Sequence, residues 1–535
     1  MAWRGAAAVL ATIAGLAGYL AHPPVSLWPL VFLPAPLLLG AVAIEVADAE
    51  ASGRTARTYR YGLLAGLVTF LPMLVWLARP AGSLAWVLLS VMQGLWYGTF
   101  TLVVRPFVQR PSIAFVAPLA WVGVEAWRGS WPLGGFDWGA LSYAHADGSW
   151  LLPTARVLGA RGVTLVTVLI GAFAFDAVRR SLAEAAGIGG PWLSRLRAGL
   201  PKAQPAFLGL AGAVLLGTLI TIEPPAATGD AVDVLAVQGN DLEDWGTRSG
   251  RAVDEQIATR VHDLTLAEVA ANGAPDLTVW PESSVDRDPY APGNEALASL
   301  VASATAAVGG NLLFGVNLQG ALPGTFENSS MLVDHAGRRL DRYVKRHLVP
   351  FGEYVPFRSL IGDLGPLRQV PRDGVPGEGP QTITAGPVRV AVAICFETLF
   401  PELVRGNVRE GGAQMILATT NDASFGRSAE PAQHLAQSRL RAVETGRWVV
   451  HAALSGSSAF VDPRGNVTQA TELFELDTIR AQVPTVSGST PFLVVGDIVG
   501  AVSRVVLLTL VAFTAVLARR RRRDTGQPAA VEPTT

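Results

Sequence analysis

Repeated apolar segments are the feature of this sequence that most constrains how the chain can fold. A bilayer core about 30 Å thick needs about 20 apolar residues in a helix that rises 1.5 Å per residue. Such segments recur up to residue 222, and one more lies near the C-terminus. The predicted spans are residues 5–21, 26–46, 61–78, 84–104, 112–127, 162–178, 206–222 and 493–518. We therefore expect a multi-span α-helical membrane bundle of about eight transmembrane helices.

The composition agrees with a membrane protein. Half of the 535 residues are hydrophobic and only 16% are charged, against about 25% charged residues in soluble domains. The formal net charge of −1 provides no basic surface of the kind that a nucleic-acid-binding protein needs. Nucleic-acid partners are therefore not expected.

Basic residues are concentrated in alternate loops. Lys and Arg accumulate in short loops on the cytoplasmic side of a membrane. The basic loops contain Arg54, Arg57 and Arg60; Arg105 and Arg110; Arg179, Arg180, Arg195, Arg197 and Lys202; and the run Arg519–Arg523. With eight spans all of them lie on one side, so both termini are predicted to be cytoplasmic. Two alternatives fit less well: residues 1–21 as a cleaved signal peptide, and Arg519–Arg523 as a nucleic-acid site.

The hydropathy divides the chain into four parts. We expect a seven-helix transmembrane domain over 1–222, an extracytoplasmic catalytic domain over 223–492, a C-terminal transmembrane helix over 493–518 and a cytoplasmic tail over 519–535. In the second part, β-branched runs alternate with amphipathic segments, which indicates an α/β domain with layered sheets and outer helices. The Gly- and Pro-rich stretch 362–380 is long for a passive connection, and it is interpreted as a lid or a membrane-facing loop.

The elements of this domain are predicted from the same patterns. Strands are expected at Val232–Gln238, Leu277–Pro281, Leu312–Val316, Ser330–Asp334, Val388–Ile394, Gln414–Thr419 and Trp448–Leu454. Helices are expected at 250–271, 294–308, 398–411 and 430–446.

Three reactive side chains each follow one of the apolar runs of this domain. Glu282 comes after Thr278–Pro281, Lys345 precedes an apolar loop that holds Glu353, and Cys395 ends the run Val390–Ile394. Together they indicate a Glu–Lys–Cys set in which the carboxylate takes the thiol proton, the thiolate attacks a carbonyl, and the ammonium stabilises the oxyanion. A helix beginning at the cysteine would lower the pKa of the thiol.

Other residues of the chain could in principle carry different chemistry. A Cys–His dyad using His347, His434 or His451 remains an alternative. The single cysteine excludes an intramolecular disulfide and a Cys-based zinc site, and the seven histidines show no spacing typical of a helical metal site. No metal and no cofactor are expected.

At these residues the chain resembles the apolipoprotein N-acyltransferase family of bacterial lipoprotein maturation, whose soluble part belongs to the nitrilase superfamily. The matching motifs are Val237–Asn240, WPES at Glu282, KRHLVPFGEYVP at Lys345, ICFE at Cys395, Thr419–Phe425, and, in the membrane part, Glu125–Arg128 and Gly134–Trp138. The resemblance implies an αββα sandwich domain above the bundle and a multi-pass protein of the bacterial cytoplasmic membrane.

The resemblance also implies roles for individual residues. Glu282 is expected to be the general base, Lys345 the oxyanion-stabilising cation and Cys395 the acylated nucleophile. Glu353 and Glu397 are expected to support the active site, and Trp245 and Phe396 to contact substrate. Two positions depart from the family pattern: Phe396 stands where many members have tyrosine, and Asp137 stands where the family has proline.

The implied reaction is ping-pong. A phospholipid acylates Cys395, and the amine of a diacylglyceryl-modified apolipoprotein cysteine then takes the acyl chain. Two alternatives remain open: a membrane-tethered nitrilase-like amidase that uses water, and a non-catalytic transporter or scaffold. Glu125, inside a predicted span, would support transport, although pairing with Arg128 at the interface explains it more simply.

Overall fold

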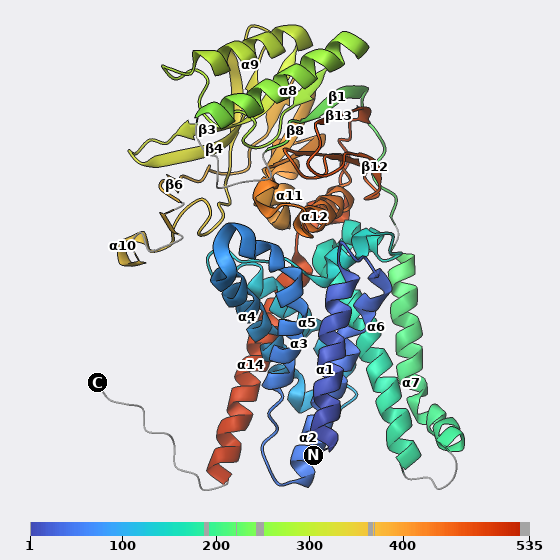
Figure 1. The fold of residues 1–535 in the computed structure, drawn as a ribbon. Coiled ribbons are helices and arrows are strands. Elements are labelled where there is room, and N and C mark those ends of the chain that lie inside the picture. Colours follow the sequence, from blue (N-terminus) through green and yellow to red (C-terminus); the bar gives the residue numbers. More distant parts are fainter. Residues whose placement is uncertain are drawn as a thin grey trace.

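The computed structural model describes residues 2–186, 192–220, 222–241, 251–361, 367, 368 and 370–524. Figure 1 shows two stacked parts, a helical bundle below and an α/β domain above. The bundle is built from the helices before residue 220 and from the last helix of the chain, which returns alongside them.

All eight predicted spans contain a helix in the structure. The bundle helices are α1 (Ala2–Ala21), α2 (Pro34–Ala51), α3 (Tyr59–Met73), α4 (Ala78–Val104), α5 (Ile113–Arg128), α6 (Ala155–Ala186), α7 (Trp192–Leu219) and α14 (Ile498–Asp524). Within the described residues, five stretches are long and apolar enough to cross a membrane: Arg4–Ala21, Trp28–Ala51, Val75–Phe107, Leu152–Ala183 and Ile498–Arg520. The helices α3 and α5 are shorter, with 15 and 16 residues.

The second predicted span differs from a single helix. It opens with a 3₁₀ turn, η1 (Trp28–Phe32), and the α-helix begins only at Pro34. A proline lacks the N–H that a helix interior needs but fits its first turn. The helix is therefore displaced toward the C-terminal side of the predicted range.

The α/β domain contains two sheets. All seven predicted strands and all four predicted helices are present; the bounds of β8 agree with the prediction, and the ends of the others are shifted. The first sheet has the order β13-β1-β2-β3-β4-β5, with β6 beside β4, and the second has the order β12-β11-β10-β9-β8-β7. The strands of the first are β1 (Ala231–Gln238), β2 (Leu277–Val279), β3 (Asn311–Gln319), β4 (Thr325–Val333), β5 (Arg339–Val344), β6 (Asp373–Gly374) and β13 (Asp477–Pro484). Those of the second are β7 (Ile383–Ala385), β8 (Val388–Ile394), β9 (Met415–Thr420), β10 (Val449–Ala453), β11 (Ala459–Val461) and β12 (Val467–Ala470).

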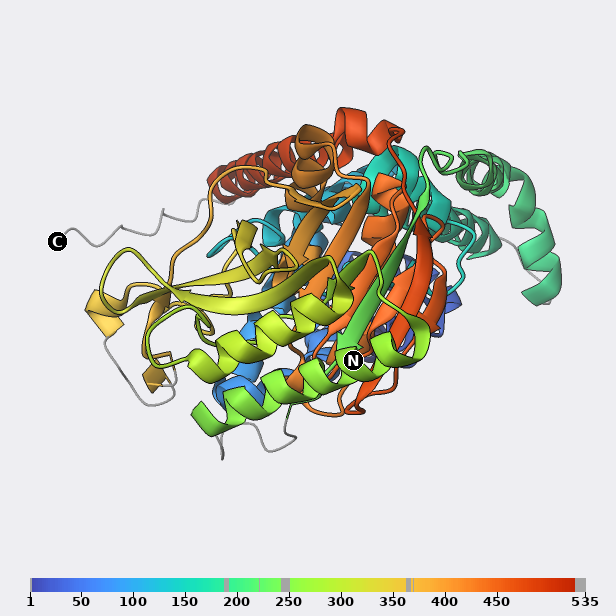
Figure 2. The same ribbon diagram turned by 90° about the horizontal axis from the view of Figure 1, so that it is seen from above.

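The two sheets pack face to face with helices on both outer sides. Their facing side chains, such as Val234, Val279, Val392 and Leu417, form one buried cluster. The helices α8 (Arg251–Asn272) and α9 (Glu295–Val308) cover the first sheet, as Figure 2 shows. The helices α11 (Pro401–Gly411) and α12 (Glu430–Thr445) cover the second. The domain is thus a four-layered αββα sandwich.

Helix α12 lies between the second sheet and the bundle (Figure 1). Its Gln433 is buried, and its Oε1 accepts hydrogen bonds from Trp76 Nε1 at 3.1 Å and Trp138 Nε1 at 2.6 Å. Its Nε2 donates to the carbonyl oxygen of Pro23 at 3.1 Å. Because the two parts share a satisfied polar contact in an apolar interface, the domain is held in one position on the bundle.

Candidate active site

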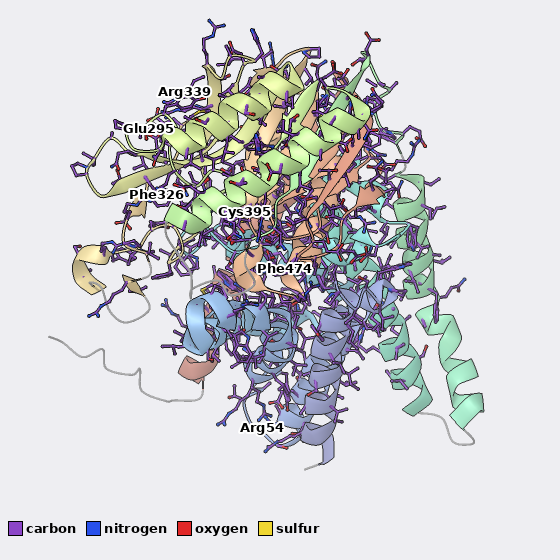
Figure 3. All side chains as sticks on the ribbon, turned by 45° about the horizontal axis from the view of Figure 1, so that its top comes forward. Arg54, Glu295, Phe326, Arg339, Cys395 and Phe474 are labelled. Carbon is purple, nitrogen blue, oxygen red and sulfur yellow. The ribbon has the colours of Figure 1, made fainter. Side chains whose placement is uncertain are left out.

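The three predicted catalytic residues come together at one end of the sandwich. Glu282 follows β2 and Lys345 follows β5, both in the first sheet, whereas Cys395 follows β8 in the second. In Figure 3, Cys395 lies in the α/β domain above the bundle, and Arg54 lies at the bundle's far end. The packing of the two sheets, which no single motif specifies, is what brings the three side chains together.

Lys345 is the centre of the charged part of the site. Its side chain is buried, with 1% of the residue exposed, and its Nζ lies 3.2 Å from Glu282 Oε1 and 2.8 Å from Glu353 Oε1. Burial opposes the ammonium, but the two carboxylates outweigh it and hold the pKa of Lys345 well above its ordinary value. The lysine is therefore a permanent, oriented cation.

Two further groups orient the carboxylates. Asn328, on β4, donates through Nδ2 to Glu282 Oε1 at 2.7 Å and to Glu353 Oε1 at 2.8 Å. The backbone N–H of Asn421 donates to Glu282 Oε2 at 3.0 Å. Asn328 was not among the predicted site residues, because one asparagine in a strand carries no pattern of its own. Asn421 lies inside the quoted motif Thr419–Phe425.

Cys395 occupies a strained turn between β8 and the helix layer. Its φ is +52°, and it begins the five-residue 3₁₀ turn η7 (Cys395–Leu399), while α11 starts only at Pro401. Burial and the charge of Glu282 raise the pKa of the thiol well above its ordinary value, against the opposing charge of Lys345. The predicted helix-dipole lowering of this pKa is therefore wrong, because no α-helix begins at the cysteine. The resting group is a thiol that needs a base.

Glu397 anchors the turn that carries Cys395. Its carboxylate accepts the backbone N–H groups of Ile394 at 2.8 Å, Arg346 at 2.7 Å and His347 at 3.1 Å. The hydroxyl of Tyr343 donates to both carboxylate oxygens at 3.0 Å. Burial raises the pKa of Glu397 to about 7. This residue ties the Cys395 turn to the segment that follows Lys345, so its support is structural.

Aromatic rings beside Cys395 pack against the bundle. Phe396 is 8% exposed, and its ring stacks on Phe136 of the bundle with centroids 6.1 Å apart. It also contacts Phe400, at 5.1 Å, and His347, at 5.7 Å. Because these neighbours are mostly apolar, Phe396 fits here without the hydrogen-bond partner that the hydroxyl of a tyrosine would need. Asp137, the other departure from the family pattern, forms a buried ion pair with Arg161 at 2.7 Å.

The geometry does not favour a Cys–His dyad. The ring of His347 stacks on Phe400 with centroids 3.6 Å apart, and burial lowers the pKa of His347 to about 4. His434 reaches the Cys395 carbonyl oxygen, at 3.0 Å. In the part of the chain that the structure describes, no histidine hydrogen-bonds to the Cys395 sulfur. Trp245 and residues 362–366 and 369 of the predicted lid lie outside the described residues.

Glu125 pairs with a different arginine from the one expected. Its Oε2 lies 3.4 Å from Arg161 Nη1 and accepts from Thr164 Oγ1 at 2.9 Å. Arg128 instead donates to the carbonyl oxygens of Phe136 and Trp138, at 3.1 and 2.8 Å. The loop 129–140 folds back so that its own backbone carbonyls meet the side chain of Arg128. The sequence spacing alone did not reveal this arrangement.

Comparison with known proteins places this architecture in a class. Residues 250–491 match the carbon-nitrogen hydrolase family model, and residues 14–173 match the model of the apolipoprotein N-acyltransferase N-terminal domain. The fold and site therefore define a nitrilase-type α/β domain joined to a membrane bundle.

The curated relatives are more specific. An apolipoprotein N-acyltransferase of Rhodopseudomonas palustris is 30% identical over 98% of this chain and 97% of its own length. One from Mycolicibacterium smegmatis is 30% identical over 91% of this chain and 82% of its own length. The chain belongs to the apolipoprotein N-acyltransferase family and is an acyltransferase. Among solved structures, an amidase from Nesterenkonia sp. is 20% identical, with 48% of this chain and 92% of that chain covered and a TM-score of 0.35.

Proposed function

We propose that this protein N-acylates the N-terminal diacylglyceryl-cysteine of apolipoproteins with an acyl chain from a phospholipid, through a thioester on Cys395. The observation that carries the proposal is the buried Lys345, which is held between Glu282 and Glu353 and interacts electrostatically with Cys395, the only cysteine of the chain. Such a set supplies a base, a cation and a nucleophile in one place.

The first half-reaction forms the thioester. Glu282 accepts the Cys395 proton, and the sulfur attacks the carbonyl carbon of a phospholipid ester. The ammonium of Lys345 stabilises the negative oxygen that develops there. When the intermediate collapses, the C–O bond breaks, and the lysophospholipid alkoxide leaves with the proton from Glu282.

The second half-reaction transfers the acyl chain. The amine of the apolipoprotein cysteine attacks the thioester carbonyl, and Glu282 accepts a proton from the attacking nitrogen. The C–S bond breaks, an amide forms, and the proton returns to the sulfur. The aromatic layer of Phe136, Phe396 and Phe400 supports this outcome, because an apolar wall beside the thioester disfavours water as the competing nucleophile.

The substrates are lipids, so the position of the site relative to the bilayer matters. We propose that eight helices span the membrane and that residues 223–492 form an extracytoplasmic domain. Helix α1 begins and α14 ends at the bundle end opposite the α/β domain, where Arg54 also lies (Figures 1 and 3). A basic loop at that end supports a cytoplasmic location for it.

Exposed apolar side chains near the site support contact with lipid. Phe357 is 69% exposed and Leu360 is 83% exposed, around the short helix α10 (Arg358–Ile361). Figure 1 shows α10 projecting to the side of the domain, close to the level where the bundle begins. Large apolar residues exposed on such a projection are typical of a membrane-contacting surface.

A transfer assay tests the proposal. The purified protein is incubated with phospholipid and a diacylglyceryl-cysteine peptide, and the peptide is analysed by mass spectrometry. We expect one added acyl group, amide-linked, and a matching amount of lysophospholipid; Cys395→Ala should abolish both. Release of free fatty acid at the same rate with and without peptide would instead identify a hydrolase, the amidase-like alternative.

A further inference from the structure

A second group of buried titratable residues lies against the backbone of the nucleophile and has no part in the steps above. It consists of Asp422 after β9, His434 on α12 and His451 on β10, and one nitrogen or oxygen from each lies within 4.8 Å of the others. All three are buried. Buried polar groups of this kind are costly unless they are paired, so their arrangement calls for a functional or structural explanation.

Both ring nitrogens of His434 face oxygen acceptors. Nε2 lies 3.0 Å from the carbonyl oxygen of Cys395, and Nδ1 lies 3.3 Å from Oδ1 of Asp422. A carbonyl oxygen and an ionised carboxylate can only accept a hydrogen bond. Thr398 Oγ1 also lies 2.9 Å from Nε2, and because its hydroxyl donates to Gln437 Oε1 at 3.2 Å it can accept from Nε2 as well. A hydrogen on each ring nitrogen satisfies all of these contacts, and a ring with two such hydrogens is the imidazolium.

The surroundings of this ring place the negative charge on Asp422. Burial opposes its ionisation, but the charge of His434 and their hydrogen bond hold the pKa of Asp422 below its ordinary value. Thr420 Oγ1 also donates to Asp422 Oδ1 at 2.7 Å. Glu430, 3.8 Å from His434 Nδ1, has its pKa raised well above the ordinary value by burial and by Asp422, and burial lowers the pKa of His451 to about 3. Both of these neighbours are therefore neutral.

The hydrogen bond between His434 and the Cys395 carbonyl matters because the backbone of Cys395 has an unusual conformation. Its φ of +52° is a conformation that residues other than glycine rarely adopt, and such a residue keeps it only when its surroundings hold it. In addition, the Cys395 carbonyl and the Phe396 N–H belong to one planar peptide unit and point in opposite directions. A charged donor on the carbonyl polarises that unit and makes its N–H a stronger donor.

We propose that Asp422 and His434 form a buried ion pair whose imidazolium donates to the Cys395 carbonyl, fixes the nucleophile's left-handed turn and strengthens the Phe396 N–H as a donor to the oxyanion. His434 is a positioning residue, since it acts through the Cys395–Phe396 peptide. The part of the proposal that concerns catalysis rests on the proposed acylation of Cys395; the charge of His434 does not.

The test uses the full-length protein in detergent with four variants. His434→Gln keeps an uncharged N–H donor, His434→Leu keeps none, and Asp422→Asn removes the partner charge. His335→Gln, at an exposed position, is the matched control. Two quantities are measured: the single-turnover rate constant of Cys395 acylation over a range of phospholipid concentrations, and the protonation of histidine nitrogens by ¹⁵N NMR of histidine-labelled protein at pH 7.5.

We expect the rate constant to fall about tenfold in His434→Gln, because a charged donor is replaced by a neutral one. It should fall further in His434→Leu and also fall in Asp422→Asn. The half-saturating phospholipid concentration should stay the same, and His335→Gln should match the wild type. The NMR spectrum should contain one histidine protonated on both nitrogens, and His434→Gln should lack it.

Three results would overturn the proposal. The first is a wild-type rate constant in His434→Gln. The second is an NMR spectrum in which His434 carries only one proton. The third is a stoichiometric metal ion in the purified wild type that is lost from His434→Gln, which would make the cluster a metal site. Because the NMR measurement requires no turnover, it separates failure of this inference from failure of wild-type Cys395 to be acylated.

Discussion

The charge of Glu282 acts on Cys395 in two opposing ways. As a negative neighbour it raises the pKa of the thiol, and in the proposed mechanism it is the base that removes the thiol proton when the substrate carbonyl is in place. A site of this kind keeps the nucleophile protonated at rest. The arrangement protects the free sulfur from unwanted electrophiles and couples its activation to substrate binding.

These two roles can be separated with Glu282→Gln. The amide removes the negative charge but leaves Lys345, so the pH at which iodoacetamide half-alkylates Cys395 should move down. Acylation by phospholipid should nevertheless fall by about 10²–10⁴-fold, because the general base is lost. Since Cys395 is the only cysteine, alkylation reports on it alone. A midpoint that moves up, or acylation at the wild-type rate, would show that Glu282 does not have this role.

The hydrogen bonds to Glu397 lead us to expect that this residue stabilises the fold. Three backbone N–H groups and one hydroxyl donate to its carboxylate. In Glu397→Gln the amide NH₂ faces some of these donors, and leaving one buried donor unpaired costs about 1–3 kcal/mol. We expect a lower thermal unfolding midpoint in detergent together with slower acylation. Glu410→Gln, at an exposed position on the neighbouring α11, should leave both unchanged; equal behaviour of the two variants would contradict the account.

At the scale of the elements, the loop between α5 and η4 (Leu141–Ala146) holds Phe136 against Phe396, the residue that follows Cys395. Gly135 and Gly148 both have a φ of +93°, but only Gly135 is crowded: an added Cβ would lie 2.2 Å from the backbone of Gly129 and Ser130. At Gly148 an added Cβ would meet nothing within 4 Å.

Gly135 lies in this loop and Gly148 follows η4, so Gly148 is a matched control for Gly135. Gly148→Ala should cost only the backbone strain of a left-handed alanine, about 1–2 kcal/mol. Gly135→Ala should suffer the same strain and must also move the backbone, which displaces Phe136 and slows Cys395 acylation. Unfolding midpoints and acylation rates of the two variants check this. Equal rates would mean that the loop does not position the site.

Many of the helices and strands could be predicted from the sequence, whereas the contacts between them could not. Strand β8 follows from the apolar run Val388–Ile394, and its bounds agree with the prediction. Six strands were not predicted: β5, β6, β7, β11, β12 and β13. In β5 and β13, polar side chains such as Arg342 and Arg480 interrupt the apolar pattern. Glu282, Lys345 and Cys395 could be selected from their positions after strands and from the family motifs. Asn328 and the Asp422–His434 pair could not, because only the packing of two sheets and α12 brings them into contact.

For the whole molecule, the stacking of the α/β domain on a helical bundle suits the proposed substrates, which are anchored in the bilayer. Helix α12 rests on the bundle through Gln433, and Phe396, next to Cys395, stacks on Phe136 of the bundle. A fixed height above the membrane replaces a search in three dimensions by one in the plane of the membrane. The proposed orientation of the domain is therefore part of the mechanism.

The orientation predicts where engineered cysteines react. In a Cys395→Ser background, Ser52→Cys lies between α2 and α3, and Ala274→Cys lies after α8; both positions are exposed. In intact cells or spheroplasts, a membrane-impermeant maleimide should label position 274. It should label position 52 only after the membrane is permeabilised. Labelling of position 52 in intact spheroplasts would invert the proposed topology.

The central claim is that Cys395 carries the acyl chain, and peptide mass spectrometry after incubation with phospholipid alone tests it most directly. The account predicts a hydroxylamine-sensitive acyl adduct on Cys395 in the wild type, strongly diminished in Glu282→Gln, which a diacylglyceryl-cysteine peptide then discharges. A folded wild-type protein that transfers acyl chains to the peptide without ever showing this adduct would contradict it.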